Sequence, residues 1–170
     1  MAIVKASFTK NTGSAKAAIR YIQHRPGREG ASTTRTLFGR DGLMGRYEAY
    51  RMIDEAEQGS RFFRLVISPD PRGEDTQQDL HLREVTEYTM QALEDRLQQS
   101  VAWVGVVHAD HAPHRHVHLV AVVKGKLNAQ DLHALRHTAT EACLQQRRER
   151  DLVRQQEREQ REEAQWAPRY

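Results

Sequence analysis

The chain has very little cysteine and no long apolar run. Cys143 is the only cysteine among 170 residues, so a disulfide within the chain is excluded and a reducing compartment is compatible with the sequence. No stretch reaches the roughly 18 apolar residues of a membrane-spanning helix, and the first residues lack the pattern of a secretory signal. We therefore expect a soluble, cytoplasmic protein with no membrane partner.

The length of the chain suits one domain with its own apolar core. The net charge of +3 is unevenly distributed, since residues 1–50 contain nine Lys or Arg residues against three acidic ones. A basic first third suits a polyanionic substrate, because phosphate contacts supply much of the affinity for nucleic acid. It is equally typical of a solvated positive face.

Hydrophobic periodicity outlines the elements. It predicts strands at residues 2–9, 34–38 and 61–68, and helices at 15–23, 45–57 and 76–98. Ser14 and Asp131 are the expected N-caps of the first and last helices. From residue 147 onward the chain is highly charged with mixed signs, so we divide it into a domain (1–145) and a charged helical tail (146–170).

Residues 101–123 carry the strongest chemical signal. Two Val-rich runs flank a polar segment with one proline, which predicts an antiparallel hairpin. Five of the nine histidines lie here, namely His108, His111, His114, His116 and His118. Because alternate side chains of a strand share a face, His116 and His118 should project together, and the hairpin can bring His108 beside them.

Three neutral imidazoles around one open position are typical of a catalytic divalent metal site. Asp110 is placed to orient an imidazole or to accept a proton. Two alternatives stay open. His114 and His116 also form a His-x-His pair, and the whole segment can be a histidine-rich surface loop beside ordinary core strands.

Two motifs give the sequence a family resemblance. His108-x-Asp110, a Pro-containing segment and His116-Val117-His118 before an apolar run resemble the third motif of plasmid-mobilisation relaxases of the MobA/MobL type, in the HUH endonuclease superfamily. Ala2-Ile-Val followed by residues 12–23 resembles the first motif of that family, whose tyrosine is the nucleophile. The resemblance covers about residues 1–140, although the spacing from His108 to the His-x-His pair differs by one residue from the commonest pattern.

The resemblance implies an α+β, two-layer fold with a central antiparallel sheet of about five strands flanked by helices. The first and last strands would lie together at its centre. It also implies nicking of single-stranded DNA at an origin of transfer, with Tyr21 forming a 5'-phosphotyrosyl link, Mn²⁺ or Mg²⁺ as cofactor, and accessory mobilisation proteins or a coupling protein as further partners. Arg25 and Arg28, near Tyr21, and Ser68, at a strand end, are then candidate DNA contacts.

Other interpretations remain for these residues. Tyr21 can be a core tyrosine, Ser68 can simply start a turn, and Tyr47 and Tyr50 are rival helix-borne nucleophiles. Two other classes of function also remain. A zinc-dependent hydrolase would act without a covalent protein–DNA species, and a non-catalytic accessory module derived from a relaxase would bind DNA without cutting it.

Overall fold

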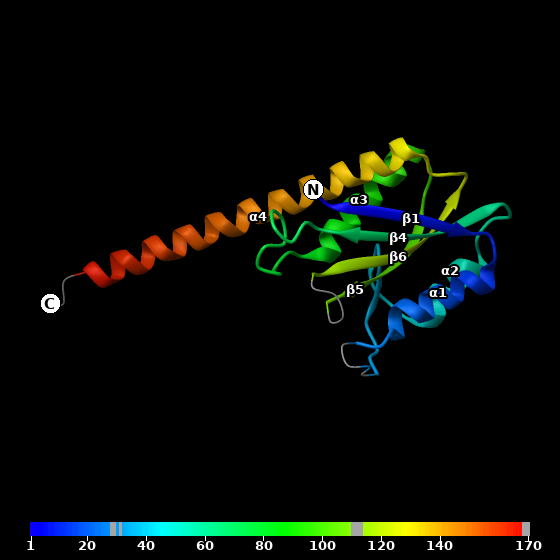
Figure 1. Ribbon diagram of the computed structural model, residues 1–170, viewed down its shortest axis with the longest axis horizontal. Helices are drawn as coiled ribbons and strands as arrows, with labels where there is room; N and C mark the ends of the chain where they lie inside the picture. The colour runs from blue at the N-terminus through cyan, green and yellow to red at the C-terminus, as the bar shows by residue number, and fades with distance from the viewer. Residues whose placement is uncertain (28–29, 31, 110–113, 168–170) are drawn as a thin grey trace.

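A computed structural model describes residues 1–27, 30, 32–109 and 114–167. Within these ranges the chain forms six strands and four helices (Figure 1). The strands are β1 (Ile3–Thr9), β2 (Leu37–Gly39), β3 (Gly42–Met44), β4 (Ser60–Ser68), β5 (Ala102–His108) and β6 (His116–Lys124). The helices are α1 (Thr12–His24), α2 (Arg46–Asp54), α3 (Leu82–Leu97) and α4 (Ala129–Trp166).

The strands form one antiparallel sheet in the order β1-β4-β6-β5-β2-β3. The predicted hairpin is confirmed, with His108 of β5 opposite His116 of β6. The expectation that the first and last strands lie together at the centre was wrong, because β1 is an edge strand and β4 lies between it and β6. β4 is apolar on both faces over much of its length, which suits a central strand, whereas β1 carries Lys5 and Ser7.

The two faces of the sheet pack against different pairs of helices. On β6, Val117 and Leu119 belong to a core shared with α3 and α4. Val120 instead belongs to a core shared with α1 and α2, together with Val104 and Val106 of β5. Side chains of one strand thus alternate between two cores, and His116 and His118 must project on the α1 side.

Three helices begin elsewhere than predicted. Asn11, not Ser14, caps α1, because its Oδ1 accepts a 2.8 Å hydrogen bond from the backbone N–H of Ser14. Asn128 caps α4 in a reciprocal pair with Asp131, each side chain accepting from the other's backbone N–H at 2.8 Å. Helix α3 begins only at Leu82, since residues 69–81 form a loop stabilised by carboxylate–backbone hydrogen bonds.

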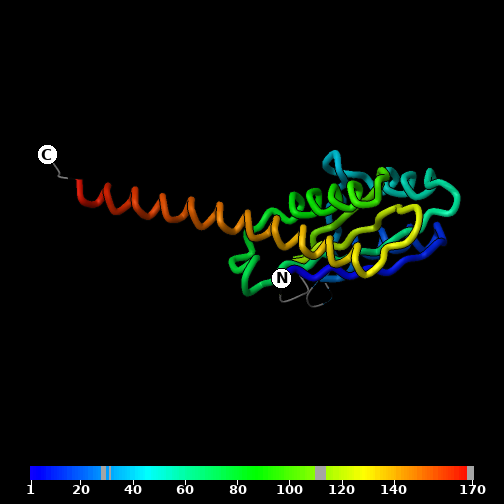
Figure 2. Tube along the Cα trace, turned by 90° about the horizontal axis from the view of Figure 1, so that it is seen from above, coloured from blue at the N-terminus to red at the C-terminus, as the bar shows by residue number. Residues whose placement is uncertain are grey.

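The last helix, α4, extends well beyond the part of the protein that it packs against. Leu135, Ala139 and Cys143 are buried, but after the buried Arg147 side chain the helix extends away from the sheet (Figures 1 and 2). The described part of the predicted 146–170 tail is therefore continuous with α4 up to Trp166. No helix in the described ranges combines the length and apolar character needed to cross a membrane.

The α+β class with a central antiparallel sheet is confirmed. Within the residues that the structure describes, the sheet has six strands rather than about five. The difference arises where one short strand was expected at 34–38, because the chain instead forms two, β2 and β3, joined by a tight turn in which Gly42 has a φ of +113°.

Candidate metal centre

Three histidines from the β5–β6 hairpin converge at one point. Each of His108, His116 and His118 offers a ring nitrogen, and these nitrogens lie within 4.8 Å of one another. The ring centroids of His108 and His118 are 4.5 Å apart, and those of His116 and His118 are 4.9 Å apart. The predicted grouping is confirmed, and the three side chains lie close enough to bind one metal ion.

A carbonyl on α1 fixes the orientation of His108. The His108 side chain is fully buried, and its Nε2 lies 2.7 Å from the backbone oxygen of Ile22. A carbonyl can only accept, so Nε2 must carry the proton, which leaves the lone pair of a neutral ring on Nδ1. This is the arrangement by which proteins present a histidine to a metal.

A second carbonyl fixes His116. Its Nδ1 lies 3.3 Å from the backbone oxygen of His114 and donates to it. The neutral ring then presents the lone pair of Nε2, which lies 3.1 Å from Nε2 of His118. Two imidazole nitrogens that face each other this closely need either one shared proton or one shared cation, so the donor set fits a metal ion.

His114 does not join this group. Its ring centroid is 6.5 Å from that of His116, and the cluster found among the described residues consists of the other three histidines. The structure therefore favours the 116/118 pair over the 114/116 pair. His111 and Asp110 lie outside the described residues.

The histidine cluster reaches a groove between α1 and the sheet through His118 alone. The groove has a volume of about 580 Å³, and both Tyr21 and His118 line it. The Tyr21 side chain is 57% exposed, so it is not a core tyrosine. Because Ile22 bonds to His108, the turn of α1 that carries Tyr21 is attached directly to the histidine cluster.

Basic and hydroxyl side chains extend the groove along the sheet. Lys5 and Ser7 of β1 and Arg64 of β4 line it, with Ser14 of α1. Sequence reasoning missed these residues as site candidates. The available signal was polar residues at every second position of an otherwise apolar strand, which indicates a sheet face that is open to solvent.

The other candidates lie in different surroundings. Tyr47 and Tyr50 pack edge to face on α2 with ring centroids 6.3 Å apart, and the described groove lining includes neither.

Of the candidate DNA contacts, Arg25 lies beside Tyr21. Its guanidinium is 5.8 Å from the centre of the Tyr21 ring, within cation–π range. Ser68 is buried at the end of β4 and shares the face of Arg64 by strand alternation, while Arg28 lies outside the described residues.

Comparison with protein-family models, with curated proteins and with solved structures gives no match. Any assignment of function therefore rests on the geometry of the site and on the motif resemblance.

Proposed function

We propose that this protein is a relaxase-type endonuclease that nicks single-stranded DNA by transesterification with Tyr21 as nucleophile. The observation that carries the proposal is that an exposed tyrosine lines the same groove as His118, one member of the three-histidine cluster. Neither feature alone would separate a nuclease from a metal-binding module. Together they support a site in which Tyr21 would attack a phosphate polarised by a metal ion at the histidines.

Tyr21 and the histidines are held together by the backbone of α1. The Ile22 carbonyl accepts from His108, and the Tyr21 carbonyl accepts a 2.8 Å hydrogen bond from the backbone N–H of Arg25, where the helix ends. These bonds limit the movement of the Tyr21 Cα relative to the cluster. Such positioning lowers the entropic cost of bringing a nucleophile into line with phosphorus.

We assign His108, His116 and His118 as ligands of a divalent cofactor, Mn²⁺ or Mg²⁺. All-nitrogen donor sets favour Mn²⁺ of these two, because imidazole is a softer ligand than water or carboxylate. When bound, the ion would supply Lewis-acid stabilisation of the charge that grows on the scissile phosphate. The cationic Lys5, Arg64 and Arg25 side chains would hold the neighbouring phosphates of the strand.

In the proposed reaction the Tyr21 oxygen bonds to phosphorus and the bond from phosphorus to the 3'-oxygen breaks. The proton of the phenol passes to a base, for which Asp110 is the candidate, and the 3'-oxygen leaves as a hydroxyl after gaining a proton. The product is a 5'-phosphotyrosyl ester, so one phosphodiester bond replaces another and the bond energy is retained. Rejoining is the same step reversed, as strand transfer during mobilisation of a plasmid or integrative element requires.

The test is incubation of the protein with end-labelled single-stranded oligonucleotides and Mn²⁺, followed by a denaturing gel and intact mass. A mass increase equal to a DNA fragment is expected, and Tyr21→Phe should reduce it by about 10³-fold or more while leaving DNA binding intact. Tyr47→Phe is the matched control and should retain the adduct. An adduct that persists in Tyr21→Phe would contradict the assignment of the nucleophile.

The same assay separates the two other classes of function. Cleavage without an adduct would indicate a hydrolase that activates water, for which zinc is the usual ion. Oligonucleotide binding without cleavage, over a pool that includes origin-like sequences, would indicate an accessory module.

A further inference from the structure

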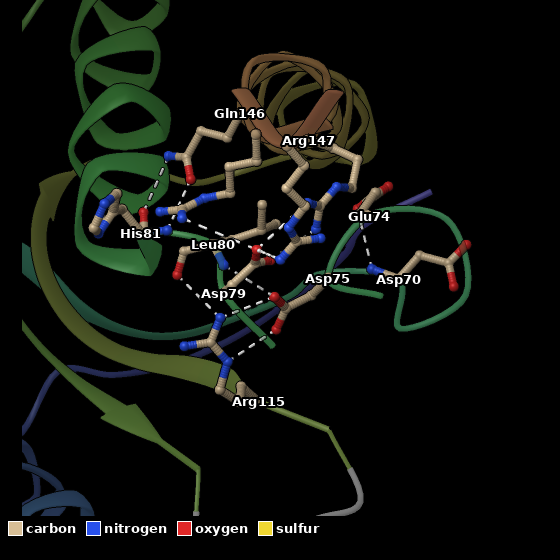
Figure 3. Close-up of polar contacts among 11 residues, drawn as sticks. Asp70, Glu74, Asp75, Asp79, Leu80, His81, Arg115, Gln146 and Arg147 are labelled. Atoms are coloured by element: carbon tan, nitrogen blue, oxygen red, sulfur yellow. Dashed lines mark hydrogen bonds and ion pairs between the residues drawn. The ribbon is translucent and has the colours of Figure 1, made fainter. Parts of the chain in front are cut away.

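The segment that leads into the histidine strand is attached to a loop on the opposite side of the sheet. Arg115, one residue before His116, donates from Nε and from an Nη to the two carboxylate oxygens of Asp75, both at 2.9 Å. The same Nη group donates to the backbone oxygen of Leu80 at 3.0 Å (Figure 3). This bidentate geometry fixes both the position and the orientation of the guanidinium.

The acceptor is itself held firmly. The Asp75 side chain is 3% exposed, and its Oδ1 also accepts from the backbone N–H of Leu80 at 3.2 Å. The neighbouring Glu74 accepts from the backbone N–H of Asp70 at 3.0 Å, so the loop is closed by its own carboxylates (Figure 3). Arg115 is therefore attached to a rigid part of the protein.

The position of Arg115 matters because of the peptide group that it shares with His114. The oxygen of that peptide group is the acceptor for Nδ1 of His116, the bond that presents Nε2 to His118. A change in the Arg115 backbone would tilt this carbonyl and release the His116 ring. The His114 carbonyl contacts the His116 ring directly, whereas the Arg115 guanidinium affects that ring only by holding the carbonyl in place.

We propose that Arg115 is a positioning residue for the metal centre, and that its pair with Asp75 sets the tautomer and angle of His116. This inference rests on the metal-binding role of the three histidines. It goes beyond that role because it assigns a function to two side chains that lie on the other face of the sheet and do not enter the groove.

The chain supplies a matched control in the same loop. Arg147 of α4 donates to Asp79 at 2.7 Å, and its side chain is 8% exposed. That hydrogen bond holds the pKa of the Asp79 carboxyl below its usual range. This second, partly buried Arg–Asp pair joins the loop to α4 rather than to the histidine strand (Figure 3), so its loss should affect stability and spare the metal centre.

The experiment is titration of the full chain with Co²⁺, read from the visible absorption of the bound ion, for wild type, Arg115→Gln, Arg115→Lys, Asp75→Asn and Arg147→Gln. We expect Arg115→Gln and Asp75→Asn each to weaken Co²⁺ binding by about 10-fold and to change the absorption spectrum, as loss of an outer partner does. Arg115→Lys, which retains the charge but not the bidentate geometry, should weaken binding less. Arg147→Gln should bind as wild type does.

The direction of the change separates positioning from simple charge effects. Removing a cation near a metal site should strengthen metal binding, and removing an anion should weaken it. Positioning predicts weaker binding in both cases. Unchanged or tighter binding by Arg115→Gln, or equal weakening in Arg147→Gln, would overturn the inference; if Arg115→Gln does not fold, the same judgement applies to Arg115→Lys and Asp75→Asn. Absence of Co²⁺ binding by wild type would overturn the metal centre itself.

Discussion

The two faces of the sheet differ in how completely the helices cover them. On the α3/α4 side, consecutive strands contribute apolar residues to one continuous core, in which Leu65, Val117 and Leu119 are almost fully buried. On the α1 side, the core ends at Val120 and Phe62, and beyond it Arg64 and His118 line an open groove. Both faces of the same strands contribute to a core, but only the α1 face also holds the open groove and the three histidines.

This difference shows how a stable sheet can carry a polar site at the end of two interior strands, where β5 ends and β6 begins. β6 is an interior strand, hydrogen-bonded on both sides to β4 and β5, so its backbone is rigid. The Cβ atoms of His116 and His118 are bonded directly to this backbone, so the two side chains start from fixed positions. Sites built on strands hold their geometry better than sites built on loops, which suits a metal centre.

The largest expected effect is loss of metal binding in His118→Ala. His118 supplies one of three nitrogens, and losing a ligand should cost more than the ~10–100-fold that loss of an outer partner costs. Stability should change little, because the side chain is only partly buried and lies at the groove. Isothermal titration with Mn²⁺ checks the first result and thermal unfolding the second. If His118→Ala bound Mn²⁺ with wild-type affinity, His118 would not be a ligand of the metal.

At the adjacent residue, Leu119→Ala is expected to lower the stability of the protein and to leave metal binding unchanged. Its side chain is 1% exposed in the α3/α4 core, and truncation of such a leucine costs about 2–5 kcal/mol of unfolding free energy. Urea unfolding measures this loss, and Ile3→Ala, at a 50% exposed position of the edge strand, is the control that should change little. The folded Leu119→Ala variant should bind the metal with wild-type affinity. A large loss of affinity without a loss of stability would contradict the division between the two faces.

The features that sequence reasoning recovered are those encoded by neighbouring residues. The hairpin, the grouping of His116 with His118, and the approach of His108 follow from strand alternation and from one short connection. Strand β4 was also predicted to within one residue, because residues 61–68 are rich in aromatic and β-branched side chains and are followed by Pro69.

The features that it missed depend on residues far apart in the chain. Nothing local in β1 indicates that β4 rather than β6 is its partner, since that choice is made by the burial of whole strands. The Arg115–Asp75 pair joins positions 40 apart, and an arginine among histidines gives no signal of a buried carboxylate partner. Helix starts shifted by a few residues because several Asn, Ser and Asp side chains compete as caps.

The smallest expected effect concerns two arginines on one strand. Arg64 lines the groove, whereas Arg61 lies on the opposite face with its guanidinium 5.4 Å from the centre of the Phe8 ring. If the groove holds a nucleic-acid strand, Arg64→Gln should weaken oligonucleotide binding several-fold and lower the slope of log affinity against log salt by about 1, the value for one lost phosphate contact. Arg61→Gln removes the same charge from the other face and should leave that slope unchanged. Fluorescence anisotropy over a salt series distinguishes the two variants. Equal slopes would mean that net charge, and not the groove, attracts the polyanion, and the comparison between the two faces would then apply to stability and metal binding alone.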